Sequence, residues 1–237
     1  MTRERRDEDA SPIIPAATVV VLRDHADGGV EALMLRRNAK LEFAGGMWVF
    51  PGGRVDDGDR AGLAVDDAEG AARRAAVRES AEEAGVELDP DALVWFSHWT
   101  PPPIAPKRFG TYFFATAAPA ADVVVTIDGG EIHDHAWMRP REAMARRDAQ
   151  EIQLGPPTWI TLAELARHET VDAALDAFRQ RPAEHFATRI ASIGDRLIAL
   201  YDGDVAYDGG DPDADGGRHR LSMADDGWRY ERDGWGS

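Results

Sequence analysis

The residues best suited to chemistry in this chain are four charged residues within six positions. They are Arg78, Glu79, Glu82 and Glu83. The surrounding run from Gly70 to Ala84 is rich in alanine and arginine, which favour helices, and Gly85 suits the left-handed residue that ends many helices. Residues three or four apart share one helix face, so the carboxylates of Glu79, Glu82 and Glu83 are expected to converge.

Converging carboxylates favour the binding of a cation. Two like charges about 4 Å apart repel by roughly 4 kcal/mol at an effective dielectric constant near 20. Mg²⁺ and Mn²⁺ prefer oxygen ligands, and Mg²⁺ often shares its shell with phosphate oxygens. Arg78 and Glu82 are four residues apart, so an ion pair between them can orient one carboxylate. A solvated acidic helix face is the alternative interpretation of such a run.

A second feature precedes the helix. The run Phe50-Pro51-Gly52-Gly53-Arg54-Val55-Asp56 is typical of a strand that enters a glycine turn. Two successive glycines allow positive φ angles and a close approach of the backbone to a ligand. Asp56, Asp57 and Asp59 follow in an acidic stretch, for which simple exposure to solvent is the alternative to a role in a site.

Together the two features resemble the signature of the Nudix hydrolases, Gly-x5-Glu-x7-Arg-Glu-U-x-Glu-Glu-x-Gly-U, where U is a bulky aliphatic residue. Gly53 opens this Nudix box, and residues 78–86 form its closing half. Asp59 stands where the signature has its first glutamate, and 18 residues separate it from Arg78 in place of seven. The box therefore carries an insertion of eleven residues at about 59–69. Glu69 is the other candidate for the first acid, and Ser80 replaces an aliphatic residue.

Further runs are similar to one subgroup of that family. Residues 35–38, 43–56 and 108–114 resemble the subgroup that includes coenzyme A and acyl-CoA diphosphatases, which carry an expanded box. The resemblance implies Mg²⁺- or Mn²⁺-dependent hydrolysis of a nucleoside diphosphate linked to another moiety, with coenzyme A or an acyl-CoA as favoured substrate. An ADP-ribose or NADH diphosphatase and a non-catalytic ligand sensor of the same fold are the alternatives.

The resemblance also implies roles for individual residues. The expected metal ligands are Gly53, Glu79, Glu82 and Glu83, and the expected catalytic residues are Arg78, Glu79, Glu82, Glu83 and Glu131. Many Nudix enzymes present a further acid, as metal ligand or general base, from the loop that holds Glu131; an ordinary turn acid is the alternative. The expected substrate-binding residues are Arg36, Arg37, Arg54, Arg108 and Phe109, with surface ion pairs as the alternative for the arginines.

Strands and helices must alternate to position these residues. Alternating apolar patterns predict strands at 17–22, 30–35, 47–50, 93–99, 109–116 and 132–138, and helical patterns cover 70–84, 140–147, 158–167 and 171–180. The order favours an α/β fold, and the resemblance implies the Nudix α/β/α sandwich with a mixed β-sheet. Residues 1–14 are expected to form a disordered charged tail and 15–165 the Nudix domain. Residues 166–237 are expected to form a C-terminal appendage of helices and short strands, the latter over 196–207 and 218–231.

Composition narrows the classes of function. The 237 residues carry a formal net charge of −16 and no cysteine, so disulfides and a cysteine nucleophile are excluded and binding to a polynucleotide is disfavoured. No apolar run approaches the roughly 20 residues of a membrane span, and the charged start lacks the apolar segment of a signal peptide. The expected partner is a small diphosphate substrate in the cytoplasm, without nucleic acid or membrane; a homodimer is left open.

Overall fold

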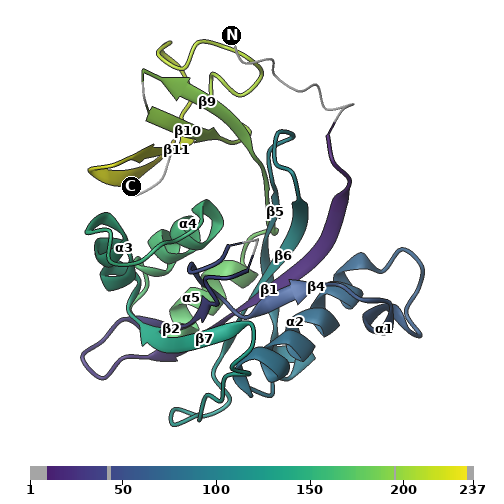
Figure 1. The fold of residues 1–237 in the computed structure, drawn as a ribbon. Helices are drawn as coiled ribbons and strands as arrows, with labels where there is room; N and C mark the ends of the chain where they lie inside the picture. Colours follow the sequence, from purple (N-terminus) through teal and green to yellow (C-terminus); the bar gives the residue numbers. More distant parts are fainter. Residues whose placement is uncertain (1–9, 42–43, 195, 234–237) are drawn as a thin grey trace. The chain divides into compact units, whose positions relative to one another are not determined.

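The computed structural model describes residues 10–41, 44–194 and 196–233. The chain divides into two compact units (Figure 1). The larger unit comprises residues 15–98 and 111–184, and the C-terminal unit comprises residues 99–110 and 185–237 with the N-terminal residues up to 14. Strands β5 and β6, which connect the units, each have residues in both.

The larger unit is built on a sheet whose middle is β1 (Ile13–Asp24). Antiparallel partners of β1 are β2 (Val30–Arg37) and the short β4 (Gly52–Arg54), and β2 in turn pairs with β3 (Trp48–Val49) and β7 (Ile132–Met138). On the other side of β1 follow β6 (Arg108–Ala117) and β5 (Val94–Thr100). The central residues Val19 to Leu22 are fully buried, which is expected for a strand covered on both faces.

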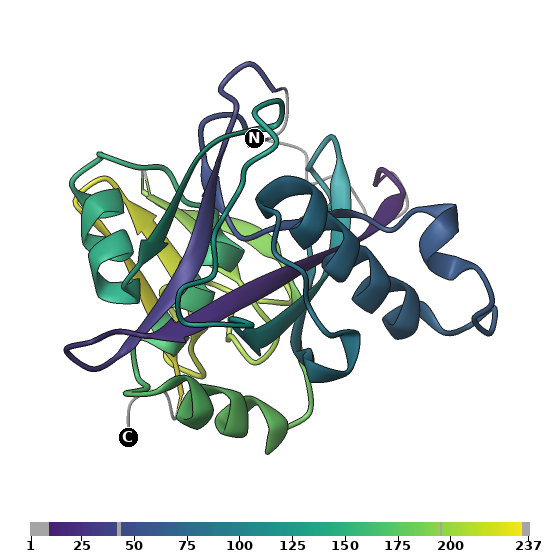
Figure 2. The ribbon, with the colours of Figure 1, turned by 90° about the horizontal axis from the view of Figure 1, so that it is seen from below.

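Helices cover both faces of this sheet (Figure 2). The helical segments are α1 (Asp57–Arg60), α2 (Ala68–Ala84), the 3-10 helix η2 (Pro90–Ala92), α3 (Pro140–Asp148), α4 (Pro156–Leu165) and α5 (Val171–Arg179). Helix α2 packs its small residues, such as Ala75 and Ala76, in one core cluster with Val19 and Leu33. Phe178 of α5 stacks on Phe96 of β5, with ring centroids 4.3 Å apart.

The C-terminal unit contains a four-stranded antiparallel sheet in the order β12-β11-β10-β9. Its strands are β9 (Arg189–Ile193), β10 (Arg196–Leu200), β11 (His219–Ala224) and β12 (Gly227–Arg232). The preceding β8 (Glu184–Ala187) lies beside the end of β5, where Phe186 stacks on Trp99 at 3.8 Å. A buried ion pair, Arg220 Nη2 to Asp204 Oδ1 at 2.6 Å, fastens the long β10–β11 connection to the sheet.

The mixed α/β architecture expected from the sequence is confirmed, and the appendage contains a separate antiparallel sheet. Strands β8 and β9 were not expected, and the strand expected over 196–207 ends at Leu200 because residues 202–207 form turns. The box insertion is not simply an exposed loop, because it begins at the end of α1, where Asp59 is buried. Of the predicted tail, residues 1–9 lie outside the described residues and Ile13 already belongs to β1.

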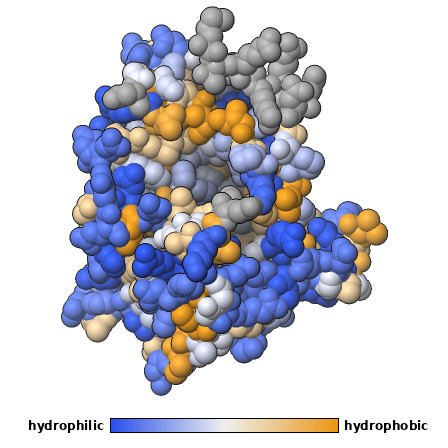
Figure 3. Space-filling model, in the orientation of Figure 1, coloured by the Kyte–Doolittle hydropathy of each residue, from blue (hydrophilic) through white to orange (hydrophobic). Residues whose placement is uncertain are grey.

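The described surface fits the acidic composition. On the face shown in Figure 3, hydrophilic residues predominate and apolar residues form small separate groups. Within the part of the chain that the structure describes, no helix combines the length and the hydrophobicity that crossing a bilayer requires.

Candidate active site

The glycine turn of the Nudix box is held against strand β1. The hydroxyl of Thr18 donates to the carbonyl of Pro51 at 2.6 Å, and the backbone N–H of Val19 donates to the same carbonyl at 2.9 Å. A Cβ atom on Gly52, whose φ is +159°, would lie 2.4 Å from the carbonyl oxygen of Ala17. Only glycine fits this position, because the neighbouring backbone cannot give way.

Helix α2 brings two glutamates onto this turn. Glu83, which is only 6% exposed, accepts a hydrogen bond at 3.0 Å from the backbone N–H of Gly52. Glu79 packs so closely that a Cβ atom on Gly53 would lie 2.2 Å from its Oε1 atom. The side chain of Glu82 lies further out and is 59% exposed. The expected convergence therefore holds most closely for Glu79 and Glu83.

Arg78 connects the helix to the inserted segment. Its guanidinium contacts Glu79 at 2.9 Å and Glu82 at 3.0 Å, and it binds the buried Asp59 through two nitrogens at 3.2 Å and 3.0 Å. It also donates to the carbonyl of Arg54 at 3.0 Å. One arginine thus orients the carboxylates of Glu79 and Glu82 and also binds the backbone of the glycine turn.

Asp59, and not Glu69, occupies the place of the first box acid. Besides binding Arg78, Asp59 accepts a hydrogen bond from the N–H of Asp56 at 2.9 Å and so completes the capping box of α1. Glu69 lies in the first turn of α2 and pairs with Arg73 at 2.6 Å. The sequence left this choice open, because eleven extra residues hide the spacing on which the signature depends.

Negative charge is poorly compensated beside the turn. Burial raises the pKa of Glu83 to about 7, and the nearby charges of Glu79 and Glu131 add to the rise. The hydrogen bond from Gly52 acts in the opposite direction and lowers this pKa. Burial also raises the pKa of Glu79, although Arg78 opposes it. Such groups favour a bound cation, which would remove the mutual repulsion of the carboxylates.

The residues present fit a divalent metal ion in their chemistry. In residues 10–41, 44–194 and 196–233, no three His, Cys, Asp or Glu side chains already form a closed metal-binding cluster. The available donors, carboxylates and the backbone carbonyl of Gly53, are all oxygens, which suits Mg²⁺ or Mn²⁺. Burial is the main cause that raises the pKa of the Glu83 carboxyl, and a bound cation would favour its charged form.

Glu131 reaches the same region from the loop before β7. The carboxylate of Asp128 accepts hydrogen bonds from the N–H groups of Glu131 and Ile132, both at 2.9 Å, and so shapes the turn. Arg37 at the end of β2 contacts Glu131 at 3.1 Å and Glu83 at 3.8 Å. Sequence reasoning assigned Arg37 to the substrate and did not anticipate that it joins two acidic side chains.

The other expected substrate-binding residues fall into two groups. Arg36 and Arg54 are exposed residues of β2 and β4, the strands that carry Arg37 and the glycine turn. Arg108 and Phe109 belong to the C-terminal unit, where Arg108 donates to the carbonyls of Pro101 and Ser11 at 3.2 Å. Arg108 therefore has backbone partners within that unit, and the substrate contacts expected for Arg108 and Phe109 stay predictions.

Large aromatic residues of the strands are mainly used in packing. Phe113 is buried and makes edge contacts with Phe50 and Phe96. Trp99 stacks on Phe186, and Trp137 lies under the guanidinium of Arg23, 4.4 Å from the ring centroid.

A surface hollow also exists away from the box. It lies in the C-terminal unit, has a volume of about 450 Å³, and is lined partly by Arg196, Trp228, Arg229 and Glu231. No Nudix-box residue contributes to its lining, and arginines and carboxylates are mixed in it. Chemistry is therefore better sought at the glycine turn, where the polar groups converge.

Comparisons with known proteins agree with this geometry. The NUDIX domain family matches residues 12–160, so the chain belongs to the Nudix family, whose members generally use divalent metals. A NUDIX hydrolase from Alicyclobacillus acidocaldarius is similar at 26% identity, with a TM-score of 0.63 over 70% of this chain and 96% of its own.

Two other solved structures are similar to a lower degree. The NUDIX domain of Shewanella oneidensis NrtR complexed with ADP ribose has 15% identity and a TM-score of 0.48, covering 69% of this chain and 92% of its own. A C. elegans Ap4A hydrolase has 22% identity and a TM-score of 0.42, covering 64% and 93%. No curated protein matches the sequence.

Proposed function

We propose that the chain is a Mg²⁺- or Mn²⁺-dependent diphosphatase that hydrolyses a nucleoside diphosphate linked to another moiety. The observation that carries this proposal is the packing of Glu79 and Glu83 against the Gly52–Gly53 turn. Arg78 binds the carboxylates of Glu79 and Glu82. Glu79, Glu82, Glu83 and the carbonyl of Gly53 would hold the metal. A bound divalent cation supplies charge withdrawal from phosphate oxygens and lowers the pKa of a bound water.

The other residues of the site act on the substrate and on the water. Arg36 and Arg54 offer exposed guanidinium groups for phosphate oxygens, which arginine binds in a bidentate manner. Glu131 accepts the proton of the attacking water. The water oxygen forms a bond to phosphorus, the bridging P–O bond of the diphosphate breaks, and the leaving phosphate takes the bridging oxygen.

Coenzyme A or an acyl-CoA is the favoured substrate. Support comes from the sequence runs 35–38, 43–56 and 108–114, which resemble the subgroup that acts on these compounds. The products would be 3′,5′-ADP and a phosphopantetheine. ADP-ribose or NADH is the alternative within the class, and basic side chains beside the adenine would favour coenzyme A because of its 3′-phosphate.

A non-catalytic sensor is a second candidate class. Such proteins often lose box glutamates, whereas Glu79, Glu82 and Glu83 are all present here. Arg78 binds Glu79 and Glu82, and the backbone N–H of Gly52 binds Glu83. The net charge of −16 also argues against a nucleic-acid partner. We therefore favour catalysis on a small molecule, and leave a homodimer to direct measurement of the mass in solution.

One screen tests the proposal. Purified protein with Mg²⁺ or Mn²⁺ is assayed against coenzyme A, acyl-CoAs, ADP-ribose, NADH and nucleotide sugars, with Glu83→Gln as the control. Turnover of one of these that Glu83→Gln lowers at least 100-fold supports the proposal. Absence of turnover with all of them, or full activity of Glu83→Gln, would refute catalysis at this site; a best substrate other than coenzyme A would refute only the narrower assignment.

A further inference from the structure

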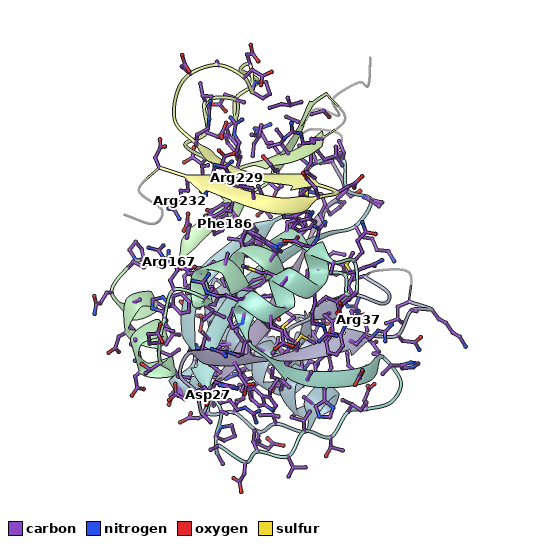
Figure 4. All side chains as sticks on the ribbon, turned by 90° about the vertical axis from the view of Figure 1, so that its left-hand side faces the viewer. Asp27, Arg37, Arg167, Phe186, Arg229 and Arg232 are labelled. Carbon is purple, nitrogen blue, oxygen red and sulfur yellow. The ribbon has the colours of Figure 1, made fainter. Side chains whose placement is uncertain are left out.

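An irregularity in the sheet directs Arg37 toward the box. Strands β2 and β7 pair regularly up to Arg36, which lies opposite Asp134, and the register then shifts so that Arg37 lies opposite Ile132. Such a bulge changes the direction of a side chain and is frequent beside active sites. Arg36 is exposed, whereas only 17% of the Arg37 side chain is exposed (Arg37 is labelled in Figure 4).

Arg37 lies between two carboxylates that come from distant parts of the sequence. Its Nη2 atom donates to Glu131 Oε2 at 3.1 Å, and its Nη1 atom lies 3.8 Å from Glu83 Oε1. Without this cation the two glutamates would repel each other, because each raises the energy of charge on the other. The planar guanidinium can serve both at once, which a lysine ammonium does less well.

The backbone around Glu131 is fixed by other groups. The N–H of Asn38 donates to the carbonyl of Glu131 at 2.7 Å, and its side-chain amide donates to Gly130 at 3.1 Å. Asp128 accepts from the N–H groups of the turn. Among the residues that the structure describes, Arg37 alone is seen to bind the carboxylate of Glu131, which is 59% exposed and would otherwise rotate in solvent.

We propose that Arg37 is a positioning residue that holds the carboxylate of Glu131 in place beside Glu83, and that its main role is not the binding of substrate phosphates. This inference rests on the proposed function insofar as Glu131 accepts the proton of the attacking water. Its structural part, that Arg37 orders the carboxylate of Glu131, stands independently of any activity.

A double-mutant cycle tests the proposal. Wild type, Arg37→Met, Glu131→Gln and the double variant are compared in kcat and KM with the best diphosphate substrate. The order of the Glu131 side chain is compared in wild type and Arg37→Met by NMR relaxation. Arg37→Lys tests for partial rescue. Arg23→Met is the matched control, since Arg23 pairs with Glu31 at 2.7 Å on the same sheet but outside the site.

We expect Arg37→Met to lower kcat about 10- to 100-fold, as a displaced reacting group does, with KM changed less than threefold. In the Glu131→Gln background the same substitution should lower kcat less than threefold further. The order parameter of the Glu131 side chain should fall by about half in Arg37→Met relative to wild type, and Arg37→Lys should recover part of both effects.

Other outcomes separate the two proposals. A raised KM with unchanged kcat, or an equal loss of kcat in the Glu131→Gln background, would show that Arg37 binds substrate and would overturn the inference. An unchanged order parameter of the Glu131 side chain in Arg37→Met would overturn it as well. If wild type cleaves no diphosphate, the proposed function fails, whereas a more mobile Glu131 side chain in Arg37→Met would still support its ordering by Arg37.

Discussion

Gly53→Ala is expected to displace the carboxylate of Glu79 without changing the stability of the fold. Gly53 has no positive φ, so alanine can adopt its backbone conformation. The added Cβ would lie 2.2 Å from Glu79 Oε1 and 2.8 Å from Oε2, whereas ordinary contacts begin near 3.4 Å. The carboxylate must therefore move by about 1 Å, and a displacement of that size can reduce a catalytic rate about 100-fold.

The end of a glutamate side chain moves at little cost, so the fold should survive this substitution. We expect Gly53→Ala to lower kcat about 100-fold while the melting temperature stays within about 3 °C of wild type. The assay is hydrolysis of the best diphosphate substrate with Mg²⁺, together with thermal unfolding. Gly58→Ala is the matched control, because no atom lies within 4 Å of the added Cβ in helix α1.

The result that would refute this reasoning is full activity in a folded Gly53→Ala protein. It would mean that the position of the Glu79 carboxylate beside the turn is unimportant for the reaction. A loss of activity accompanied by a large fall in melting temperature would instead show that the turn itself is disrupted, as we expect for Gly52→Ala, where backbone atoms lie only 2.4 Å from the new Cβ.

Three further substitutions or conditions have defined expectations. Ser80→Ala should raise the free energy of unfolding by about 1–2 kcal/mol in chemical denaturation, because the fully buried Ser80 hydroxyl has no hydrogen-bond partner among the described residues; a less stable variant would contradict this. Asp59→Asn should lower the free energy of unfolding by about 1–3 kcal/mol and reduce kcat, because Arg78 loses its buried anionic partner. An unchanged kcat would show that Asp59 does not orient the glutamates through Arg78. Because burial raises the pKa of Glu83 from 4.5 to about 7, the protein without metal should lose stability as the pH rises through that range. The affinity for Mn²⁺ should increase over the same range, because the ligand must be deprotonated. Calorimetric titration with Mn²⁺ at pH 5.5 and 7.5 checks this, and equal affinities would refute it.

Local patterns predicted much of the site. The spacing of Glu79 and Glu83 on one helix face and the small residues Ala75 and Ala76 on another are properties of a few helical turns, and the structure confirms both. The glycine turn was predictable for the same reason. The C-terminal strands were harder to predict, since they are short and are interrupted by Gly- and Asp-rich turns.

Contacts between distant residues could not be read from the sequence. Arg37 and Glu131 are 94 residues apart, and they meet because of a register shift between β2 and β7 that no local pattern reveals. The first acid of the box was ambiguous for a related reason, since Asp59 in the short helix α1 reaches Arg78 across the insertion.

The insertion within the box is fixed at both of its ends. Asp59 is bound by Arg78 before it, and Asp67 caps α2 after it by accepting a hydrogen bond from Gly70 at 2.8 Å. Between these anchors lies Val65, whose side chain is fully exposed. Since the chain has no cysteine, Val65→Cys would create a unique thiol for a spectroscopic label on a loop tip, where changes are best tolerated. The protein thus offers a built-in attachment point for a fluorescent or spin-label reporter between the two halves of its own signature motif.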